Sequence, residues 1–132
     1  MYIDLLNDAI LNRNLTGMIL YLSKVQDLNN PDCRDRLPLS LAASMESGND
    51  ISYPEVIGLL VASGALVSAV NKEGKTAIMH AAENNRLDNL MRLIRLGSDI
   101  HAKDLQGKRV LRYAVSKGKF DCAFELMEHG AA

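Results

Sequence analysis

The feature that most constrains this chain is an internal repeat. Ala81 recurs as Ala114 at an offset of 33 (114 − 81), which lays "NKEGKTAIMHAAENN" over "DLQGKRVLRYAVSKG". Ala42 precedes Ala81 at an offset of 39 (81 − 42), and Ala9 precedes Ala42 at an offset of 33 (42 − 9). Self-similarity at such a period indicates an array of stacked units, in which each unit buries its apolar face only against its neighbours. The spacing predicts a single domain of four units with approximate boundaries at 1–31, 32–70, 71–103 and 104–132.

Each unit has the same internal order. A polar, turn-like stretch precedes a short helix that ends in or near a small pair such as Ala-Ala, and a second helix rich in Leu, Ile and Met follows. The second helices read "LTGMILYLSK", "YPEVIGLLVASG", "LDNLMRLIRLG" and "KFDCAFELMEHG". Gly64, Gly97 and Gly130 stand where a helix needs a left-handed residue after its C-terminus. We therefore expect two helices per unit, with the second helix ending at these glycines.

This pattern resembles the ankyrin repeat, whose unit has about 33 residues and the signature T-P-L-H-x-A. In the third unit the residues that carry the resemblance are Gly74, Thr76, Ile78, Ala81, Ala82, Leu93, Ile94, Gly97, Asp99 and Ala102. In the second unit they include Pro38, Leu39, Ala42, Ala43, Leu59, Leu60, Gly64 and Ala65, and in the fourth Gly107, Leu111, Ala114, Leu126 and Gly130. The resemblance implies an all-α ankyrin-repeat solenoid of helix-turn-helix units joined by β-hairpin-like loops, with the first and last units acting as caps.

The third unit departs from the family signature at its histidine. Met79 holds the fourth place and His80 follows it, so the hydrogen bond that the family's histidine directs toward the Thr76 hydroxyl should be missing. Ser40 and Arg112 hold this place in the neighbouring units. Since such side-chain caps contribute roughly 0.5–2 kcal/mol each, we expect a less stable array than the family consensus. Met79 is interpreted as a flexible apolar contact on or near the binding face.

The wider offset of the second unit corresponds to an insertion of six (39 − 33), within "SMESGNDISYPEV" (residues 44–56). Gly, Asn, Asp, Ser and Pro dominate this segment, as expected of a surface loop between the two helices of the unit. Two interpretations remain open. The segment is either a tolerated insertion or a partner-contacting loop with Tyr53 as an exposed aromatic anchor.

No catalytic or metal-binding pattern is visible in the sequence. His80, His101 and His129 fall at repeat positions and form no His-x3-His, HExxH or Cys/His cluster. Cys33 and Cys122 form no CxxC pair. Glycine fingerprints for nucleotides and the GxSxG nucleophile motif are absent as well. We expect a protein that is not an enzyme and that uses no cofactor and no metal.

Composition narrows the setting of the protein. The formal net charge is −1, and no apolar run approaches the roughly 20 residues that a membrane-spanning helix needs. The N-terminal "MYIDLLNDAILNR" lacks the basic start and apolar block of a signal peptide. Together with the two unrelated thiols, these features predict a cytoplasmic protein that does not act at a membrane.

One segment concentrates positive charge. Residues 103–119 hold six cations against Asp104 alone, which gives 6 − 1 = +5 and leaves −6 for the rest of the chain. The cations are Lys103, Lys108, Arg109, Arg112, Lys117 and Lys119. This is either a solvated charged cap, or Lys108, Arg112 and Lys117 with Tyr113 form a basic end of the binding face that meets an acidic protein. Nucleic acid is disfavoured as a partner because the total charge is balanced and aromatic residues amount to 5 %.

The resemblance implies a non-enzymatic, monomeric protein-protein interaction module that acts as an adaptor or inhibitor. Its concave face of hairpin tips and first helices would bind one protein partner. The predicted contact residues are Arg34, Arg36, Tyr53, Lys72, Glu73, Lys75, Met79, Glu83, Asn84, Lys108, Arg112, Tyr113, Ser116 and Lys117. The alternatives are a regulatory ankyrin segment of a larger enzyme or effector, and a dedicated immunity-type inhibitor of one enzyme.

Overall fold

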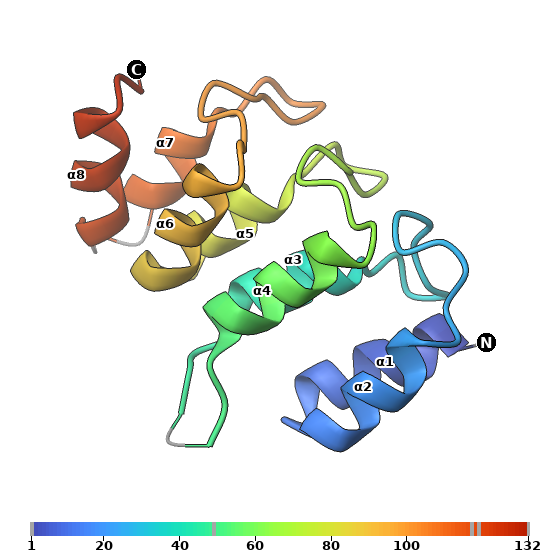
Figure 1. Cartoon of the computed structure of the whole chain (residues 1–132). Helices are drawn as coiled ribbons and strands as arrows, with labels where there is room; N and C mark the ends of the chain where they lie inside the picture. The colour runs from blue at the N-terminus through green and yellow to red at the C-terminus, as the bar shows by residue number, and fades with distance from the viewer. Residues whose placement is uncertain (1, 49, 117, 119, 132) are drawn as a thin grey trace.

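The chain forms a row of helix pairs that runs from one terminus to the other (Figure 1). The structure, a computed structural model, describes residues 2–48, 50–116, 118 and 120–131. The helices are α1 (Tyr2–Leu11), α2 (Leu15–Leu22), α3 (Pro38–Ser44), α4 (Tyr53–Ala62), α5 (Ala77–Glu83), α6 (Leu87–Arg95), α7 (Val110–Val115) and α8 (Asp121–Glu128). The only β-structure in these described ranges is an isolated bridge between Lys103 and Arg109. The all-α expectation is confirmed.

The first helices of the pairs stack side by side because small residues line their contacts. α1 packs on α3, α3 on α5, and α5 on α7, while the second helices α4, α6 and α8 contact one another in order. Ala42 and Ala43 of α3 and Ala81 and Ala82 of α5 are at most 1 % exposed. Alanine at these positions lets the helices approach closely, and the larger aliphatic side chains of the second helices fill the layer behind.

The second helices end as the glycine pattern predicts. Gly64 has a φ of 113°, and Gly97 and Gly130 have φ values of 94° and 92°. After α4 the Gly64 N–H donates to the Val61 carbonyl at 3.1 Å, and the next N–H donates to the Leu60 carbonyl at 3.0 Å. The same pair of hydrogen bonds recurs after α6 and α8. This is the Schellman arrangement, in which a left-handed residue satisfies the last carbonyls of a helix.

Three hairpin-like turns join the helix pairs. Each turn begins with an Asp or Asn whose side-chain oxygen accepts hydrogen bonds from backbone N–H groups of the turn. In the second of these turns, Asn71 Oδ1 accepts the Glu73 and Lys75 N–H groups at 3.0 and 3.1 Å. Asp32 and Asp104 make the equivalent two bonds in their own turns. The backbone N–H of each of the three donates to the carbonyl four residues later. One short acceptor side chain therefore sets the shape of each turn.

The six-residue insertion lies between α3 and α4, but Tyr53 is not an exposed anchor. Its side chain is 0 % exposed, and its hydroxyl donates to the Ile10 carbonyl of α1 at 2.7 Å. The Tyr53 N–H bonds to Ser47 Oγ at 2.9 Å, and the Arg13 guanidinium lies 5.6 Å from the ring centroid. The prediction was wrong because an aromatic ring at the start of α4 gains more by covering the end of α1 than by facing water.

Met79 is not a surface contact either. It is 0 % exposed on α5, a helix that packs against α3 on one side and α7 on the other. Because successive helical residues point about 100° apart, burying Met79 turns His80 toward the open side of the array. The Thr76 hydroxyl has no hydrogen-bond partner among the described residues. The predicted loss of the histidine–threonine bond is confirmed there.

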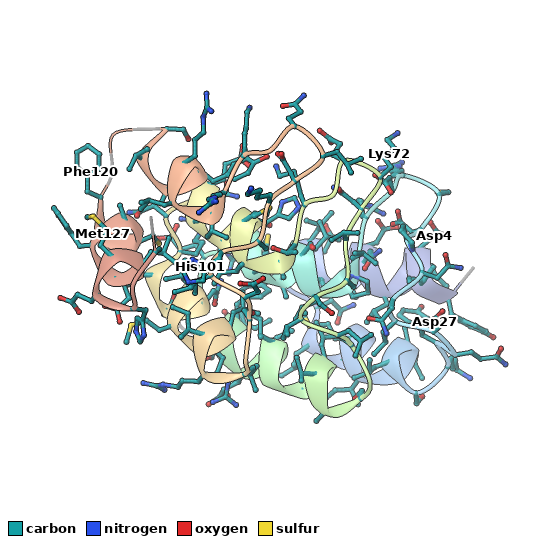
Figure 2. All side chains as sticks on the ribbon, turned by 90° about the horizontal axis from the view of Figure 1, so that it is seen from above. Asp4, Asp27, Lys72, His101, Phe120 and Met127 are labelled. Carbon is teal, nitrogen blue, oxygen red and sulfur yellow. The ribbon has the colours of Figure 1, made fainter. Side chains whose placement is uncertain are left out.

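The last unit presents a mixed outer surface. On α8, Asp121 and Glu128 are exposed, and so are Phe124 and Met127, at 61 % and 47 %. Phe120, just before the helix, packs its ring edge-on to Phe124 with centroids 6.3 Å apart. Figure 2 shows Phe120 and Met127 at the end of the array opposite Asp4.

Candidate protein-binding face

The three hairpins project from the same side of the row of helices (Figure 1). We call the hairpin face the surface formed by residues 32–36, 71–75 and 104–108, by α3, α5 and α7, and by Asn84 and Ser116, which follow α5 and α7. The predicted contact residues that are exposed on it are Arg34, Lys72, Glu73, Arg112 and Ser116. Those that are half-buried on it are Arg36, Lys75, Glu83, Asn84, Lys108 and Tyr113. Tyr53 and Met79 belong to the core, and Lys117 lies outside the described residues.

The hairpins are tied to one another by backbone groups. The Lys72 N–H donates to both oxygens of Asp35 at 3.2 and 3.4 Å, which links the second hairpin to the first. The Leu105 N–H donates to the Glu73 carbonyl at 3.0 Å, which links the third to the second. A Cβ at Gly74, where φ is 78°, would lie 2.9 Å from the Leu105 nitrogen. Only glycine permits this close approach, so the hairpins form one preformed surface.

Arg36 joins the first two units more than it faces a partner. Its guanidinium bonds to Asp32 at 2.7 Å and to Asp8 at 3.3 Å, and its side chain is 16 % exposed. Asn7 of α1 donates to the same Asp32 carboxylate at 2.9 Å. Burial opposes ionisation of Asp32, but the hydrogen bonds from Asn7, Arg36 and Arg34 outweigh it and hold its pKa below the usual value. Little of the Arg36 side chain remains for an external contact.

At the end of the hairpin face formed by α7, the Tyr113 ring has a lysine near it from each of two units. The Tyr113 hydroxyl donates to Asp104. Lys75 Nζ lies 4.8 Å from the ring centroid and Lys108 Nζ lies 5.9 Å from it. Lys75 also bonds to Glu83 at 2.8 Å. Cations near an aromatic face are held in place by the ring quadrupole, so the two lysines of this cluster are positioned before any partner arrives.

The Tyr113–Asp104 pair keeps its proton on the phenol. Burial raises the pKa of Tyr113, and the hydrogen bond to the Asp104 carboxylate raises it further. The same hydrogen bond lowers the pKa of Asp104. Near neutral pH the pair therefore carries one negative charge, on Asp104, and the nearby Lys108 ammonium favours it.

A basic and apolar depression lies against α7. It has a volume of about 400 Å³ and is lined by Gly107, Arg109, Leu111, Arg112 and Val115. Leu105, at the tip of the third hairpin, is 77 % exposed. Leu105 was not among the predicted contact residues. Its position directly after Asp104, which forms the turn, was the sequence signal that could have predicted its exposure at the hairpin tip.

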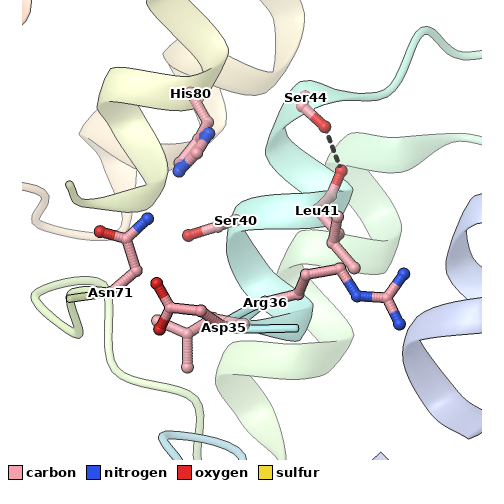
Figure 3. Close-up of a pocket in the computed structure, with 8 residues that line it drawn as sticks. Asp35, Arg36, Ser40, Leu41, Ser44, Asn71 and His80 are labelled. Atoms are coloured by element: carbon pink, nitrogen blue, oxygen red, sulfur yellow. Dashed lines mark hydrogen bonds between the residues drawn. The ribbon is translucent and has the colours of Figure 1, made fainter. Parts of the chain in front are cut away.

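The structure also brings together polar residues that were not among the predicted contact residues. Ser40 of α3, His80 of α5 and the turn residues Asp35 and Asn71 line one crevice between the second and third units (Figure 3). Burial lowers the pKa of His80 to about 4, and the nearby Lys75 ammonium adds to the effect. His80 is therefore neutral at physiological pH. The sequence signal that could have pointed to this crevice is that Asn71 and His80 differ from the residues at the equivalent positions of the other units.

Cys33 and Cys122 are free thiols. Burial, and to a smaller extent the negative charge of the nearby Asp121, raises the pKa of Cys122 to about 12. Within the described ranges, no three His, Cys, Asp or Glu side chains gather where they could hold a metal ion. None of the helices in that part of the chain is long and apolar enough to cross a membrane.

Residues 39–132 match the family model for ankyrin repeats, which describes three copies, and the chain therefore belongs to the ankyrin repeat family. It is 30 % identical over 91 residues to the transient receptor potential cation channel subfamily A member 1 of Drosophila melanogaster, covering 69 % of this chain and 7 % of that protein. It is 32 % identical over 78 residues to the B-cell lymphoma 3 protein homolog of Mus musculus, covering 58 % of this chain and 17 % of that protein. The chain thus spans less than a fifth of either relative.

Ankyrin repeats typically serve as protein-protein interaction modules. They are the one kind of domain identified in the chain, and no catalytic domain is identified beside them.

Proposed function

We propose that this protein binds one folded protein partner through the hairpin face and acts as an adaptor or inhibitor without catalysing a reaction. The observation that carries the proposal is the construction of the three hairpins. Each is folded by the same side-chain bonds, and each of the second and third is tied to the one before it. A surface that is already ordered loses little conformational entropy on binding, and this raises affinity for a partner of matching shape.

Charge favours an acidic partner surface. Arg34, Lys72 and Arg112 are exposed on the hairpin face, and Lys75 and Lys108 are held near the Tyr113 ring. Asp35, Glu73 and Glu83 interrupt this positive charge. A mixed surface of this kind speeds encounter with an acidic protein and sets its orientation. It does not offer the continuous basic track that a nucleic acid backbone requires.

A second candidate function is that of a regulatory ankyrin segment of a larger enzyme or effector. It is favoured by the small share of the relatives that the chain covers, 7 % and 17 %. Both candidates use the hairpin face, and both place the protein in the cytoplasm as a monomer. In the first candidate the hairpin face binds a separate protein, whereas in the second it binds another part of the same larger protein.

The decisive experiment is quantitative binding with two charge-reversal variants. The partner is isolated by affinity capture on the wild-type protein and then titrated by calorimetry. Lys108→Glu/Arg112→Glu changes the hairpin face, whereas Lys24→Glu/Arg95→Glu makes the same charge change at exposed residues outside that face. The first variant should weaken binding at least tenfold and the second by less than twofold, with equal helical circular dichroism. Equal affinities of the two variants would refute the hairpin face as the binding surface.

A further inference from the structure

The crevice between the second and third units contains hydrogen-bonding groups that the fold leaves unused. It has a volume of about 80 Å³ and opens on the hairpin face between α3 and α5. Ser40 is 7 % exposed, and its hydroxyl has no hydrogen-bond partner among the described residues. Figure 3 shows this hydroxyl pointing into the gap between Asn71 and His80. A few waters fill such a volume, and so does the polar end of one short side chain.

The orientation of the Asn71 amide follows from its bonds. Its Oδ1 is occupied by the Glu73 and Lys75 N–H groups, so its NH₂ group is turned toward the crevice. At the equivalent positions of the other hairpins stand Asp32 and Asp104, whose second carboxylate oxygens accept bonds from Asn7 and Tyr113. The Asn71 NH₂ group has no such partner in the described part of the chain. The third unit therefore presents a donor where the others present an acceptor.

The other groups at the crevice supply acceptors. The imidazole of His80 is neutral, so one ring nitrogen donates and the other accepts. Asp35 accepts the Lys72 N–H and keeps lone pairs for a further donor. The Arg36 guanidinium is turned away toward Asp32 and Asp8 (Figure 3). The Ser44 hydroxyl is used by the Leu41 carbonyl at 2.7 Å.

We infer that this crevice recognises a carboxamide, the side-chain group of an asparagine or glutamine on the partner. A carboxamide has one acceptor and two donors on a planar group, so its oxygen can accept from Asn71 and Ser40 while its NH₂ donates to His80 or Asp35. An ammonium group would leave the Asn71 NH₂ unpaired. A carboxylate would meet the negative charge of Asp35. Buried polar groups that stay unpaired in the wrong complex give strong discrimination.

This inference rests on the proposed use of the hairpin face, and its test needs no protein partner. Acetamide, acetate and methylammonium are three probes of similar size, each titrated separately into the ¹⁵N-labelled protein and followed by NMR. Acetamide should shift the Asn71 side-chain amide and the His80 ring signals saturably, with a roughly millimolar dissociation constant. Acetate and methylammonium should give no saturable shift at these signals. Absence of saturation with acetamide, or equal binding of either other probe, overturns the inference.

Variants separate recognition from nearby packing. Asn71→Asp keeps the acceptor for the turn, as Asp32 and Asp104 do, but removes the donor, and should weaken acetamide binding at least tenfold. Ser44 lines the same crevice, but its hydroxyl already donates to the Leu41 carbonyl. Ser44→Ala should therefore change acetamide binding less than twofold. Unchanged acetamide binding in Asn71→Asp overturns the inference. The charge-reversal variants of the proposed function leave these crevice residues intact, so failure here and failure of the hairpin face are distinguishable.

Discussion

The Tyr53 hydroxyl donates a buried hydrogen bond to the Ile10 carbonyl at 2.7 Å, across 43 residues of chain. The bond lets the start of α4 close the C-terminal end of α1. The next unit makes the same connection with other groups, since Arg86 Nε donates to the Ser44 carbonyl at 3.0 Å. In both places a side chain at the start of a second helix satisfies the last turn of the preceding first helix, whose carbonyls have no helical partner.

Removing the Tyr53 hydroxyl should destabilise the fold without affecting partner binding. In Tyr53→Phe the ring stays buried and the Ile10 carbonyl loses its side-chain donor, which should lower the free energy of unfolding by about 1–2 kcal/mol. Urea denaturation followed by circular dichroism measures this change. The control is Tyr2→Phe at a residue 39 % exposed, where we expect a change below about 0.5 kcal/mol. Equal effects of the two substitutions would contradict the role assigned to the Tyr53 bond.

Replacing Asn89 should lower the stability of the fold more than replacing Tyr53. The Asn89 Nδ2 lies 3.3, 3.1 and 2.8 Å from the carbonyl oxygens of Ala42, Ala43 and Met45 at the end of α3, and Asn89 is 0 % exposed. Asn89→Leu keeps a similar volume but leaves these carbonyls without their donor. We expect a loss of about 2–3 kcal/mol in urea denaturation. Asn30→Ala, at an exposed position, serves as the control, and a loss in Asn89→Leu no larger than in that control would show that other groups satisfy the end of α3.

Replacing the buried Thr76 hydroxyl should stabilise the protein. Thr76 is 7 % exposed at the start of α5, and its Oγ1 has no partner among the described residues. Thr76→Val keeps the shape and removes an unsatisfied polar group, so the free energy of unfolding should rise by about 1 kcal/mol. Chemical denaturation of the two proteins side by side measures the difference. A destabilised valine variant would indicate that the hydroxyl is satisfied in solution, for instance by water.

His80 should make the protein less stable in acid. Above pH 6.5 the ring is neutral in both the folded and the unfolded chain, so it adds no pH dependence. As the pH falls from 6.5 toward 4, the unfolded chain takes up a proton that the folded chain resists, because the folded pKa is about 4. The destabilisation should grow across this window to about 3 kcal/mol.

The substitution His80→Leu isolates this effect. Leucine occupies the equivalent position of the second unit, at Leu41, and it has no proton to gain. Denaturation curves of both proteins at pH 7, 5.5 and 4 should show the variant losing less stability than the wild type as the pH falls. The carboxylates titrate in both proteins and cancel in the difference. Parallel losses would mean that His80 is protonated as easily in the fold as in water.

The local architecture was readable from the sequence because short-range interactions produce it. The recurrence of Ala42, Ala81 and Ala114 predicted the stacked first helices. Gly64 and Gly97 predicted the ends of second helices, because a left-handed residue closes a helix through bonds to carbonyls three to five residues back. These helix ends depend on neighbours within about one turn, and they recur after α4, α6 and α8.

The candidate site could be predicted only in part. The exposed charges of the hairpin face, such as Lys72 in a hairpin and Arg112 on α7, follow from their place in the repeat. The crevice does not, because Ser40 and His80 come from different units and meet only when α3 packs on α5. The orientation of the Asn71 amide likewise depends on two backbone N–H groups of the folded hairpin.

The sequence by itself determined the repeat, the helix pairs and the family. Only the tertiary structure decided which side chains are exposed and which are buried. Tyr53 and Met79 were expected at the surface and lie in the core, and Arg36 was expected to be available but bonds to Asp32 and Asp8. The physical reason is the range of the interactions. Residues 25 to 47 positions apart in the chain hold these units together, and a local pattern does not reveal which of them meet.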